Sequence, residues 1–349
     1  MRRSSYLLSL FSSVALLASL AVAAPVASAT TSTVVTATQV QYPATLLASV
    51  PLVRITFNSP VTASEIPKLT LSPAVPTQWQ QVGPNTVQAV THGYLVPDLH
   101  YVTNVPTSLN CASTCSVATS RATVLTATGS LGWMDQLLAQ LGYLPVSFTP
   151  SVAQTSPVAQ VPGTFTWRFA KLPVNLRVLW HVGTYNVILK GALMHFQDVH
   201  HFLTTGLPSA QTWQMLLRDA TLKTHNPTPW NYVWVTEARP EMLTLFINGQ
   251  VAYRTLVNTG ISQAPTADGT YPVYLRFTST TMSGTNPDGS KYHDTGIPWV
   301  SYFNGGDALH GFIRYSYGYP QSLGCVEMMY THAGLVWPHT PIGTLVTIY

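Results

Sequence analysis

Cys325 is the residue of this chain best suited to covalent chemistry, and it lies near the C-terminus in Ser322-Leu323-Gly324-Cys325-Val326. A thiolate is a strong nucleophile, but it forms near neutral pH only beside a base or a positive field. His310 lies fifteen residues upstream and is the base we expect. Gly324 permits a tight turn, which lets nearby backbone N–H groups point at a developing oxyanion. The pattern predicts an acyl-transfer site; the alternative is a Cys325 that is only a small buried hydrophobe.

The other two cysteines form a separate pair. Cys111 and Cys115 lie four residues apart, and in an exported protein such a pair predicts a local disulfide. A metal half-site is the competing interpretation, but no second Cys or His pair of matching spacing follows, so we expect no metal and no cofactor. Cys325 is then left unpaired, and an unpaired thiol in an oxidising compartment favours a reactivity that is used.

Residues 1–29 have the features of a secretory signal peptide. Arg2 and Arg3 give a basic start, Leu7–Ala24 is apolar, and Ala27-Ser28-Ala29 is a small-x-small cleavage site. A retained membrane anchor is the alternative, since the apolar run nears the length of a short span. No later apolar run is long enough to cross a bilayer. We therefore expect a secreted protein of the cell wall or extracytoplasmic space, with no stable membrane span after cleavage.

Composition indicates several globular domains. The chain of 349 residues is longer than one core usually serves, and hydrophobic residues make up 46% of it. Charged residues are only 8%, far below the usual level of about a quarter, and the net charge of +4 is spread out. No Lys or Arg cluster is dense enough to indicate nucleic-acid binding. A mildly positive surface is compatible with an anionic wall polymer.

Residues 30–128 carry short apolar alternations typical of strands, separated by turn residues such as Asn58-Ser59-Pro60. The alternating stretches are 52–57, 86–90 and 101–103. Many short strands at this spacing predict a small antiparallel sandwich. The piece Ile55–Val61 resembles the opening of bacterial Ig-like modules on exported proteins. We expect an Ig-like β module that serves as a spacer or in adhesion, without a catalytic residue.

Residues 129–224 show helical periodicity. Three stretches share an apolar stripe at helical spacing: 134–141, which Gly142 ends; 189–203, up to Leu203; and 213–220, which Ser209 caps. The Pro-rich stretch from about 147 to 186 is expected to be irregular. His195, His200 and His201 invite a metal hypothesis, but positions i+5 and i+6 do not share a helix face with i, so no metal is expected there.

The same region has pieces of a known wall-binding pattern. They are Leu137–Pro145, Ala192–Gln197 and Thr212-Trp213 with Leu216-Leu217. Together they resemble a peptidoglycan-binding domain of the three-helix type. The long insertion between the first and second helices departs from that pattern. The resemblance implies a small wall-binding domain ahead of the region that carries Cys325.

From residue 230 the sequence turns to strands. The expected strands are 232–236, 242–247, 251–257, 272–277 and 343–349. Asn248-Gly249 separates the second and third of these and predicts a type I′ hairpin turn. The segment Ser283–Ser290 is rich in Gly, Asn and Asp, and it is expected to be an exposed loop that can cover a cleft.

Several pieces of residues 230–349 carry a family pattern in the right order and spacing. They are Asn258-Thr259-Gly260, Pro265-Thr266, Gly269-Thr270, Met282-Ser283-Gly284, His310-Gly311 and Ser322–Val326. In this order they resemble the catalytic domain of L,D-transpeptidases of the YkuD type, in which a His-containing strand and a loop precede Ser/Thr-x-Gly-Cys. The resemblance implies a mainly-β sandwich. The expected fold is multidomain: an Ig-like β-sandwich, a three-helix domain with an insertion, and this catalytic sandwich.

The resemblance implies roles for individual residues. Cys325 would be the nucleophile and His310 the base, while Ser322 would orient the loop or bond near the thiol, or serve only as a turn residue. Two positions depart from the family: Leu323 stands where His is frequent, and Glu327 where Arg or Asn is frequent. Glu327 is either a substrate contact or a structural carboxylate.

Residues around His310 complete the candidate site. Asp307 and Asn304 precede it and are candidates to orient it, and Gly311 follows it. Aromatic residues either line the cleft or pack the sandwich; they are Tyr302, Phe303, Tyr315 and Tyr317.

The implied reaction is acyl exchange between peptidoglycan stem peptides, which forms 3→3 cross-links and releases D-alanine. Attack by water instead of an amine would make the enzyme an L,D-carboxypeptidase, and a non-enzymatic wall-binding protein is a further alternative. Papain-like wall hydrolases place Cys before His in the chain, so the order here argues against them. The expected partners are peptidoglycan stem peptides and glycan, and no nucleic acid.

Overall fold

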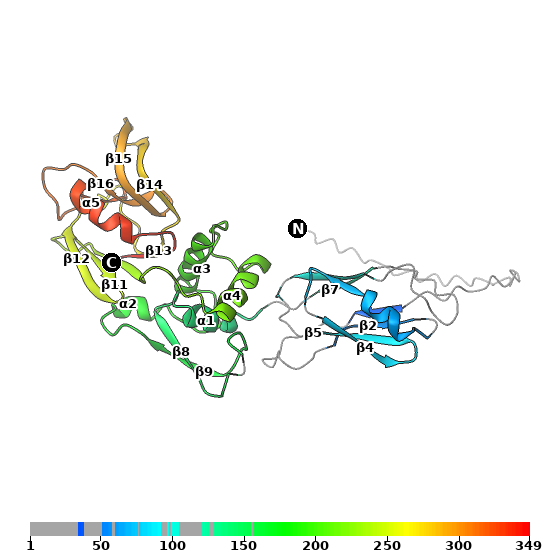
Figure 1. Ribbon diagram of the computed structural model, residues 1–349. Helices are drawn as coiled ribbons and strands as arrows, with labels where there is room; N and C mark the ends of the chain where they lie inside the picture. The colour runs from blue at the N-terminus through cyan, green and yellow to red at the C-terminus, as the bar shows by residue number, and fades with distance from the viewer. Residues whose placement is uncertain are drawn as a thin grey trace, which may run out of the picture.

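The computed structural model describes residues 34–37, 51–57, 60–75, 77–91, 96–97, 99–104, 121–125, 129–154 and 156–349. The predicted signal segment and the predicted Cys111–Cys115 disulfide lie outside these residues. Within the described ranges, no helix is both long enough and apolar enough to span a membrane. Figure 1 shows N-terminal strands, a helical region and a C-terminal β region following one another along the chain.

The N-terminal strands form two sheets. The first has the order β1-β2-β5-β4 and the second β3-β6-β7. Their bounds are β1 Val34–Ala37, β2 Pro51–Thr56, β3 Thr70–Ser72, β4 Thr77–Gly83, β5 Thr86–Thr91, β6 His100–Asn104 and β7 Arg121–Leu125, with a 3-10 helix η1 at Ala63–Lys68. Ile55, Val87 and Tyr101 are buried in a common core, as alternating apolar residues of facing sheets require. The assignment of this region to an Ig-like module stays a prediction.

Three helices follow, and each begins at a polar cap. They are α1 Leu131–Gln140, α3 Val187–Val199 and α4 Ala210–Leu222. The side chains of Ser130, Asn186 and Ser209 accept hydrogen bonds from the first free N–H groups of these helices, so the predicted cap at Ser209 is confirmed. Their apolar stripes meet in one buried cluster that includes Leu137, Trp213 and strand residues from the C-terminal region.

Two expectations for this region are wrong. The stretch 147–186 is not irregular throughout: it holds a hairpin, β8 Val146–Pro150 with β9 Gly163–Trp167, and a short helix α2, Val174–Arg177. Alternating residues of the hairpin, such as Phe148 and Phe165, pack on the helical core, which periodicity over a Pro-rich stretch does not reveal. Leu203 lies beyond α3 and is 82% exposed, because His201 adopts a positive φ of 57° that ends the helix.

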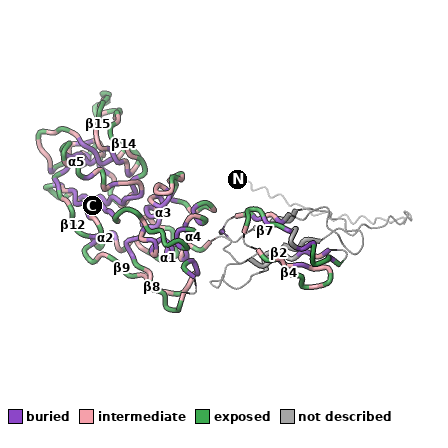
Figure 2. The backbone as a smooth tube through the Cα atoms, viewed as in Figure 1, coloured by how far each residue is buried: buried purple, intermediate pink, exposed green. Residues whose placement is uncertain are grey.

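The C-terminal region is built from two sheets. The five-stranded sheet has the order β12-β11-β10-β18-β13 and the four-stranded sheet β14-β15-β16-β17. The strands are β10 Asn231–Thr236, β11 Met242–Ile247, β12 Gln250–Leu256, β13 Gly269–Pro272, β14 Leu275–Thr285, β15 Lys291–Asn304, β16 Asp307–Gly311, β17 Val326–Met328 and β18 Leu345–Ile348. Helix α5 (Tyr330–Val336), followed by η2 (Trp337–His339), packs on β15 and β16. Figure 2 shows the buried residues running through the inner strands and helices.

Local turn chemistry is confirmed at the first hairpin of this region. Asn248 and Gly249 have φ values of 47° and 71°, as a type I′ turn requires. The expected strand 272–277 is instead divided between the two sheets. Val273 still bonds to the β18 side, its N–H donating to Thr344 O at 2.8 Å, whereas the N–H of Tyr274 donates to Tyr302 O in β15 at 2.9 Å. The passage of the chain from one sheet to the other depends on tertiary contacts, so the local sequence pattern does not predict it.

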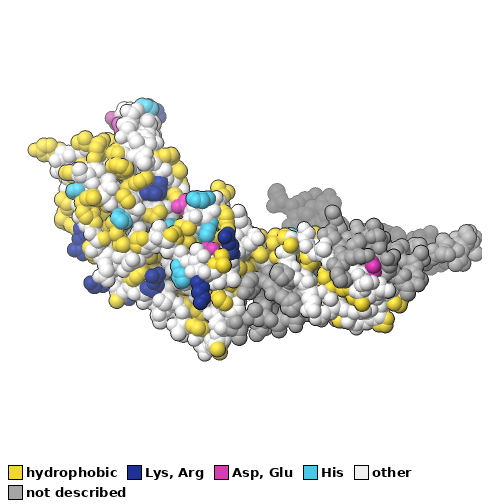
Figure 3. Space-filling model, viewed as in Figure 1, with side chains coloured by type: hydrophobic (Ala, Val, Ile, Leu, Met, Phe, Trp, Pro, Cys, Tyr) yellow, Lys and Arg dark blue, Asp and Glu magenta, His cyan; other side chains and the backbone are white. Residues whose placement is uncertain are grey.

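The expected loop at Ser283–Ser290 is mostly a hairpin end. Thr285 pairs with Lys291, so only the tip between β14 and β15 is a turn. Most side chains of β14 are partly or fully exposed, and the hairpin projects from the body of the domain (Figure 1). Figure 3 shows that the charged side chains on the visible face are few and dispersed, in keeping with the low charged fraction of the sequence.

The helical region and the C-terminal sheet meet at a joint of two glycines. A Cβ on Gly343 would lie 2.2 Å from Gly191 O and 2.6 Å from His195 N, and a Cβ on Gly191 would lie 2.7 Å from Gly343 O. Contacts that short leave no room for a methyl group on either residue. The two glycines therefore set how closely α3 approaches the chain ahead of β18.

Substitution of Gly343 tests this joint. Gly343 has φ +87°, and Gly289 has φ +86° with nothing within 4 Å of a built Cβ, so Gly289→Ala is a control with matched backbone strain. We expect Gly289→Ala to lower the free energy of unfolding by about 1 kcal/mol, and Gly343→Ala to lower it by about 2–4 kcal/mol because overpacking adds to the strain. Denaturant unfolding of both variants measures the difference, and equal losses would contradict the close approach.

Candidate active site

Parallel strand pairing brings the two predicted reactive residues together. β16 and β17 are parallel neighbours in which His310 is the partner of Glu327, and Cys325 immediately precedes β17. The fourteen residues between His310 and Cys325 comprise the end of β16 and a loop that brings the chain back alongside that strand. Both side chains line one cleft of about 760 Å³, over which the β14–β15 hairpin contributes Met282, Asn286 and other residues.

His310 is presented in a defined tautomer. The ring is only 2% exposed, and its Nδ1 lies 3.0 Å from Gly311 O. A carbonyl oxygen can only accept, so Nδ1 carries the proton and Nε2 is left as the basic nitrogen. Burial lowers the pKa of His310, although the bond to Gly311 and the charge of Glu327 oppose that shift. The imidazole is therefore a neutral base at physiological pH.

Cys325 is partly exposed to the cleft and is a free thiol. Burial raises its pKa to about 12, and the charges of Asp307 and Glu327 act in the same direction. The backbone N–H of Ala308 faces the sulfur and lowers the pKa, while Sγ itself lies 3.7 Å from Gly306 O. The resting site consequently pairs a neutral thiol with a neutral imidazole, and a thiolate forms only as the proton is removed.

The turn before Cys325 depends on Gly324 and Ser322. Gly324 has φ +113°, and a Cβ there would lie 2.4 Å from Asp307 Oδ1, so only glycine fits. Ser322 Oγ donates to Cys325 O at 2.5 Å and accepts from Gly324 N at 3.2 Å. The Gly324 N–H is therefore engaged in the turn. Outside the strand ladders, no backbone partner binds the Cys325 N–H among the described residues, which leaves it a candidate oxyanion donor.

Asp307 and Asn304 have bonding partners other than the imidazole. Asp307 Oδ2 accepts from Ala267 N at 3.3 Å, and the Asn304 side chain also bonds to this carboxylate. Neither residue bonds to His310 anywhere in the described ranges, so nothing supports the hypothesis that they orient it. Gly311 instead holds the ring, through its carbonyl.

The four candidate aromatics separate into different roles. Tyr302 lines the cleft, and burial raises the pKa of its hydroxyl. Phe303 is buried in the core between the sheets, and Tyr315 is fully exposed away from the cleft lining. The Tyr317 hydroxyl donates to Phe312 O at 2.6 Å and so fixes the loop.

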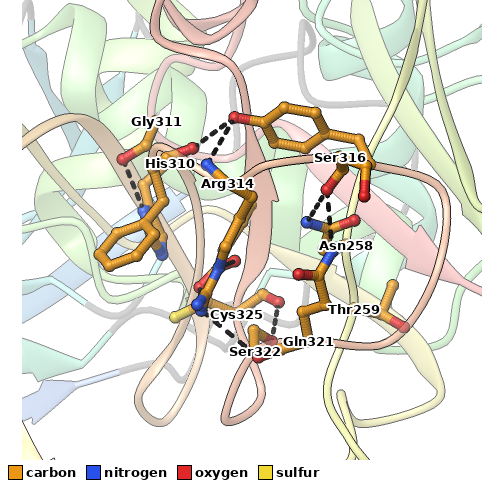
Figure 4. Close-up of polar contacts among 12 residues, drawn as sticks. Asn258, Thr259, His310, Gly311, Arg314, Ser316, Gln321, Ser322 and Cys325 are labelled. Carbon is orange, nitrogen blue, oxygen red and sulfur yellow. Dashed lines mark hydrogen bonds and ion pairs between the residues drawn. The ribbon is translucent and has the colours of Figure 1, made fainter.

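Glu327 is a structural carboxylate with a partner that sequence reasoning missed. It is 4% exposed, and both its oxygens accept from Arg314, at 2.7 Å from Nε and 2.8 Å from Nη2. Arg314 lines the same cleft. In Figure 4 the Arg314 side chain runs towards the Cys325 turn. A buried carboxylate is stabilised by a paired cation. Arg314 is the one arginine between His310 and Cys325, so the sequence could have indicated it as the partner of Glu327.

The segment Asn258-Thr259-Gly260 braces the turn from its other side. Asn258 pairs with Glu327, and Gly260 with Ser322, through isolated backbone bridges. Asn258 also accepts from Gly318 N at 3.0 Å and donates to Ser316 O at 3.2 Å. These bonds give a structural role to Asn258-Thr259-Gly260, a piece of the family pattern whose role the sequence alone does not explain.

The helical histidines have structural partners. His195 bonds to Ile342 O at 3.1 Å and to Thr228 Oγ1 at 2.8 Å, and His200 lies 2.8 Å from an Asp219 oxygen. His201 ends α3. In the portion of the chain that the structure describes, no three His, Cys, Asp or Glu side chains are grouped as metal ligands would be.

Comparison with known proteins identifies the C-terminal region. Residues 231–348 match the model of the YkuD family, described as the L,D-transpeptidase catalytic domain. No curated protein sequence matches the chain.

Solved structures resemble the chain only distantly. An L,D-transpeptidase from Mycobacterium smegmatis is 10% identical over 86% of this chain and 91% of its own, with a TM-score of 0.32. The catalytic domain of an E. faecium L,D-transpeptidase is 21% identical over 36% of this chain and 100% of its own, with a TM-score of 0.32. L,D-transpeptidase 3 from Mycobacterium tuberculosis, with a faropenem-derived adduct, is 12% identical over 86% and 91%, with a TM-score of 0.31.

Removal of the Ser322 hydroxyl tests the turn. Ser322→Ala deletes one donor and one acceptor in a site that is 1% exposed, which should cost about 1–3 kcal/mol of stability and displace Cys325. We expect alkylation of Cys325 by iodoacetamide to slow about tenfold, as followed by peptide mapping and mass spectrometry. Ser262→Ala, at an exposed position near the cleft, is the control. Equal rates in the two variants would contradict the role of Ser322.

Proposed function

We propose that this protein is a cysteine L,D-transpeptidase that forms 3→3 cross-links in peptidoglycan. The observation that carries the proposal is the pairing of β16 with β17, which puts a neutral His310 base and the Cys325 thiol on one cleft. The match of residues 231–348 to the L,D-transpeptidase catalytic domain supports the class of reaction. Cys325 as nucleophile and His310 as its base are parts of the proposal.

The first half of the reaction acylates the thiol. His310 Nε2 takes the proton from Cys325 as the sulfur attacks the carbonyl of the third residue of a tetrapeptide stem. The Cys325 N–H is the donor placed to hold the oxyanion, and one such donor is typically worth about 3–4 kcal/mol. The imidazolium then gives its proton to the leaving amine, so D-alanine departs and a thioester remains.

The second half of the reaction transfers the acyl group. A side-chain amine of a neighbouring stem attacks the thioester, and His310 accepts the amine's proton before returning it to the sulfur. The product is a 3→3 cross-link. Water attack on the same thioester would give L,D-carboxypeptidase activity, which is the second product that an assay must distinguish.

The remaining regions suit a protein that works on the wall. The domain class implies a peptidoglycan substrate, and we assign to the three-helix region a wall-binding role and to the N-terminal strands a spacer role. These assignments place the protein outside the cytoplasmic membrane. A non-enzymatic wall-binding protein would show the same attachment without chemistry at Cys325.

Replacement of Cys325 tests the proposed function. Cys325→Ala should abolish dimers from a defined tetrapeptide substrate and also the covalent adduct with a carbapenem, because no other residue that lines the cleft carries a thiol. The measurement is mass spectrometry of the products and of the intact protein. His225→Gln, an exposed histidine of the helical region, should keep the wild-type yield.

The product masses separate the alternatives. Dimers that have lost D-alanine indicate transfer, and monomeric tripeptide without dimers indicates the carboxypeptidase. Full dimer formation by Cys325→Ala would contradict the proposal, and so would a wild-type protein that binds wall without any adduct on Cys325.

A further inference from the structure

The proposed nucleophile lies at the end of a long loop. Residues 312–325 connect β16 to β17, and no helix or named strand interrupts them. Fixing such a segment in one conformation costs considerable chain entropy. The position of Cys325 therefore depends on the side-chain bonds that hold this loop.

Arg314, near the start of this loop, bonds to residues near and just beyond the end of it. Its Nε and Nη2 donate to the two oxygens of Glu327, and Nη2 also donates to Gln321 O at 3.3 Å. The guanidinium thus bonds to Gln321, four residues before Cys325, and to Glu327, two residues after it. Bidentate arginine–carboxylate bonds fix direction as well as distance, which a single lysine ammonium does not do.

The same side chain also contacts the strand end that carries His310. The Arg314 guanidinium lies over the Phe312 ring, 4.6 Å from its centroid. The Phe312 ring meets the His310 ring edge to face, with 6.0 Å between centroids. A cation over an aromatic face is held by the ring quadrupole. Arg314 is therefore packed between the parts of the chain that present the base and the thiol.

The Arg314–Glu327 pair also affects the electrostatics of the site. Burial is the main cause of the raised pKa of Cys325 and of the lowered pKa of His310. The Glu327 charge adds to the first shift and opposes the second, and Arg314 acts against Glu327 at His310. Without the guanidinium, that negative charge would stand uncompensated beside a thiol that must become a thiolate. Other ionisable groups face the pair from β15, from β16 and from the loop itself; they are Asp294, Tyr292, Tyr302, Asp307 and Tyr317.

We propose that Arg314 is a positioning residue for acyl transfer: anchored on Glu327, it holds the loop that ends in Cys325 and cancels the carboxylate charge next to the reacting groups. Glu327 then serves the reaction as the anchor of Arg314 and not as a substrate contact. The inference rests on the proposed function only in taking Cys325 as the nucleophile.

Alkylation of Cys325 by iodoacetamide reports its thiolate without any wall substrate. Peptide mapping separates Cys325 from the other two cysteines, and rates are measured from mildly acidic to alkaline pH. We expect Arg314→Gln to slow alkylation about tenfold at a fixed pH and to move the pH profile upward, because loss of the positive charge raises the thiol pKa and one pKa unit is a tenfold change in thiolate. The double variant Arg314→Gln/Glu327→Gln should return towards the wild-type profile, since the uncompensated charge is gone.

Arg314→Lys separates charge from geometry. This variant keeps the positive charge but loses the bidentate bonds to Glu327. We therefore expect a wild-type pH profile for alkylation. For acyl transfer we expect an approximately tenfold lower kcat with little change in KM. The variant also keeps the buried pair charged, which keeps the test available if Arg314→Gln does not fold. Arg254→Gln, an exposed position on β12, is the matched control and should change neither readout.

Two results would overturn the proposal. One is an Arg314→Gln variant whose alkylation rate and pH profile equal those of Arg254→Gln. The other is a double variant that reacts no faster than Arg314→Gln. A wild-type protein that shows the expected alkylation behaviour but transfers no acyl group would refute the proposed function and leave the role of Arg314 in holding the thiol intact.

Discussion

His310 is buried and Cys325 is only partly exposed to the cleft, and the chemistry of the site depends on this desolvation. Burial disfavours whichever form of a group is charged, so it raises the pKa of the thiol and lowers that of the imidazole. The two shifts together favour a neutral pair over a thiolate–imidazolium pair. A resting thiol of this kind resists oxidation, which follows thiolate character, and it becomes nucleophilic only when an acceptor carbonyl draws the proton transfer forward.

The contacts around His310 and Cys325 position the two groups for that proton transfer. Gly311 O binds Nδ1 of His310 and leaves Nε2 as the base, while the parallel register of β16 with β17 places the ring beside the turn that carries Cys325. The N–H of Ala308 favours the thiolate as it forms. Ser322 and Gly324 fix the turn itself, and the Arg314–Glu327 pair closes the loop behind it. Each of these contacts matters because fixed dipoles that are already oriented cost no reorganisation when charge develops during the reaction.

The sequence allowed the local parts of this account to be predicted and concealed the long-range ones. The Cys325 turn, the need for Gly324 and the hairpin at Asn248-Gly249 follow from residue type alone, since each depends on backbone conformation over a few residues. The division of 272–277 between two sheets and the Arg314–Glu327 pair depend on contacts that only the folded chain makes. The bonds of Asp307 to Ala267 and Asn304 were hidden for the same reason, because its proximity to His310 in sequence says nothing about which way its carboxylate points.

The ionisation state of Cys325 decides whether this description holds. Thiolates absorb in the ultraviolet where thiols do not, so the difference spectrum between the wild-type protein and Cys325→Ser reports the thiolate as pH is raised. A neutral resting pair predicts no thiolate signal at neutral pH and its appearance only under alkaline conditions. A full thiolate signal at neutral pH would show a pre-formed ion pair and contradict a site built on desolvation.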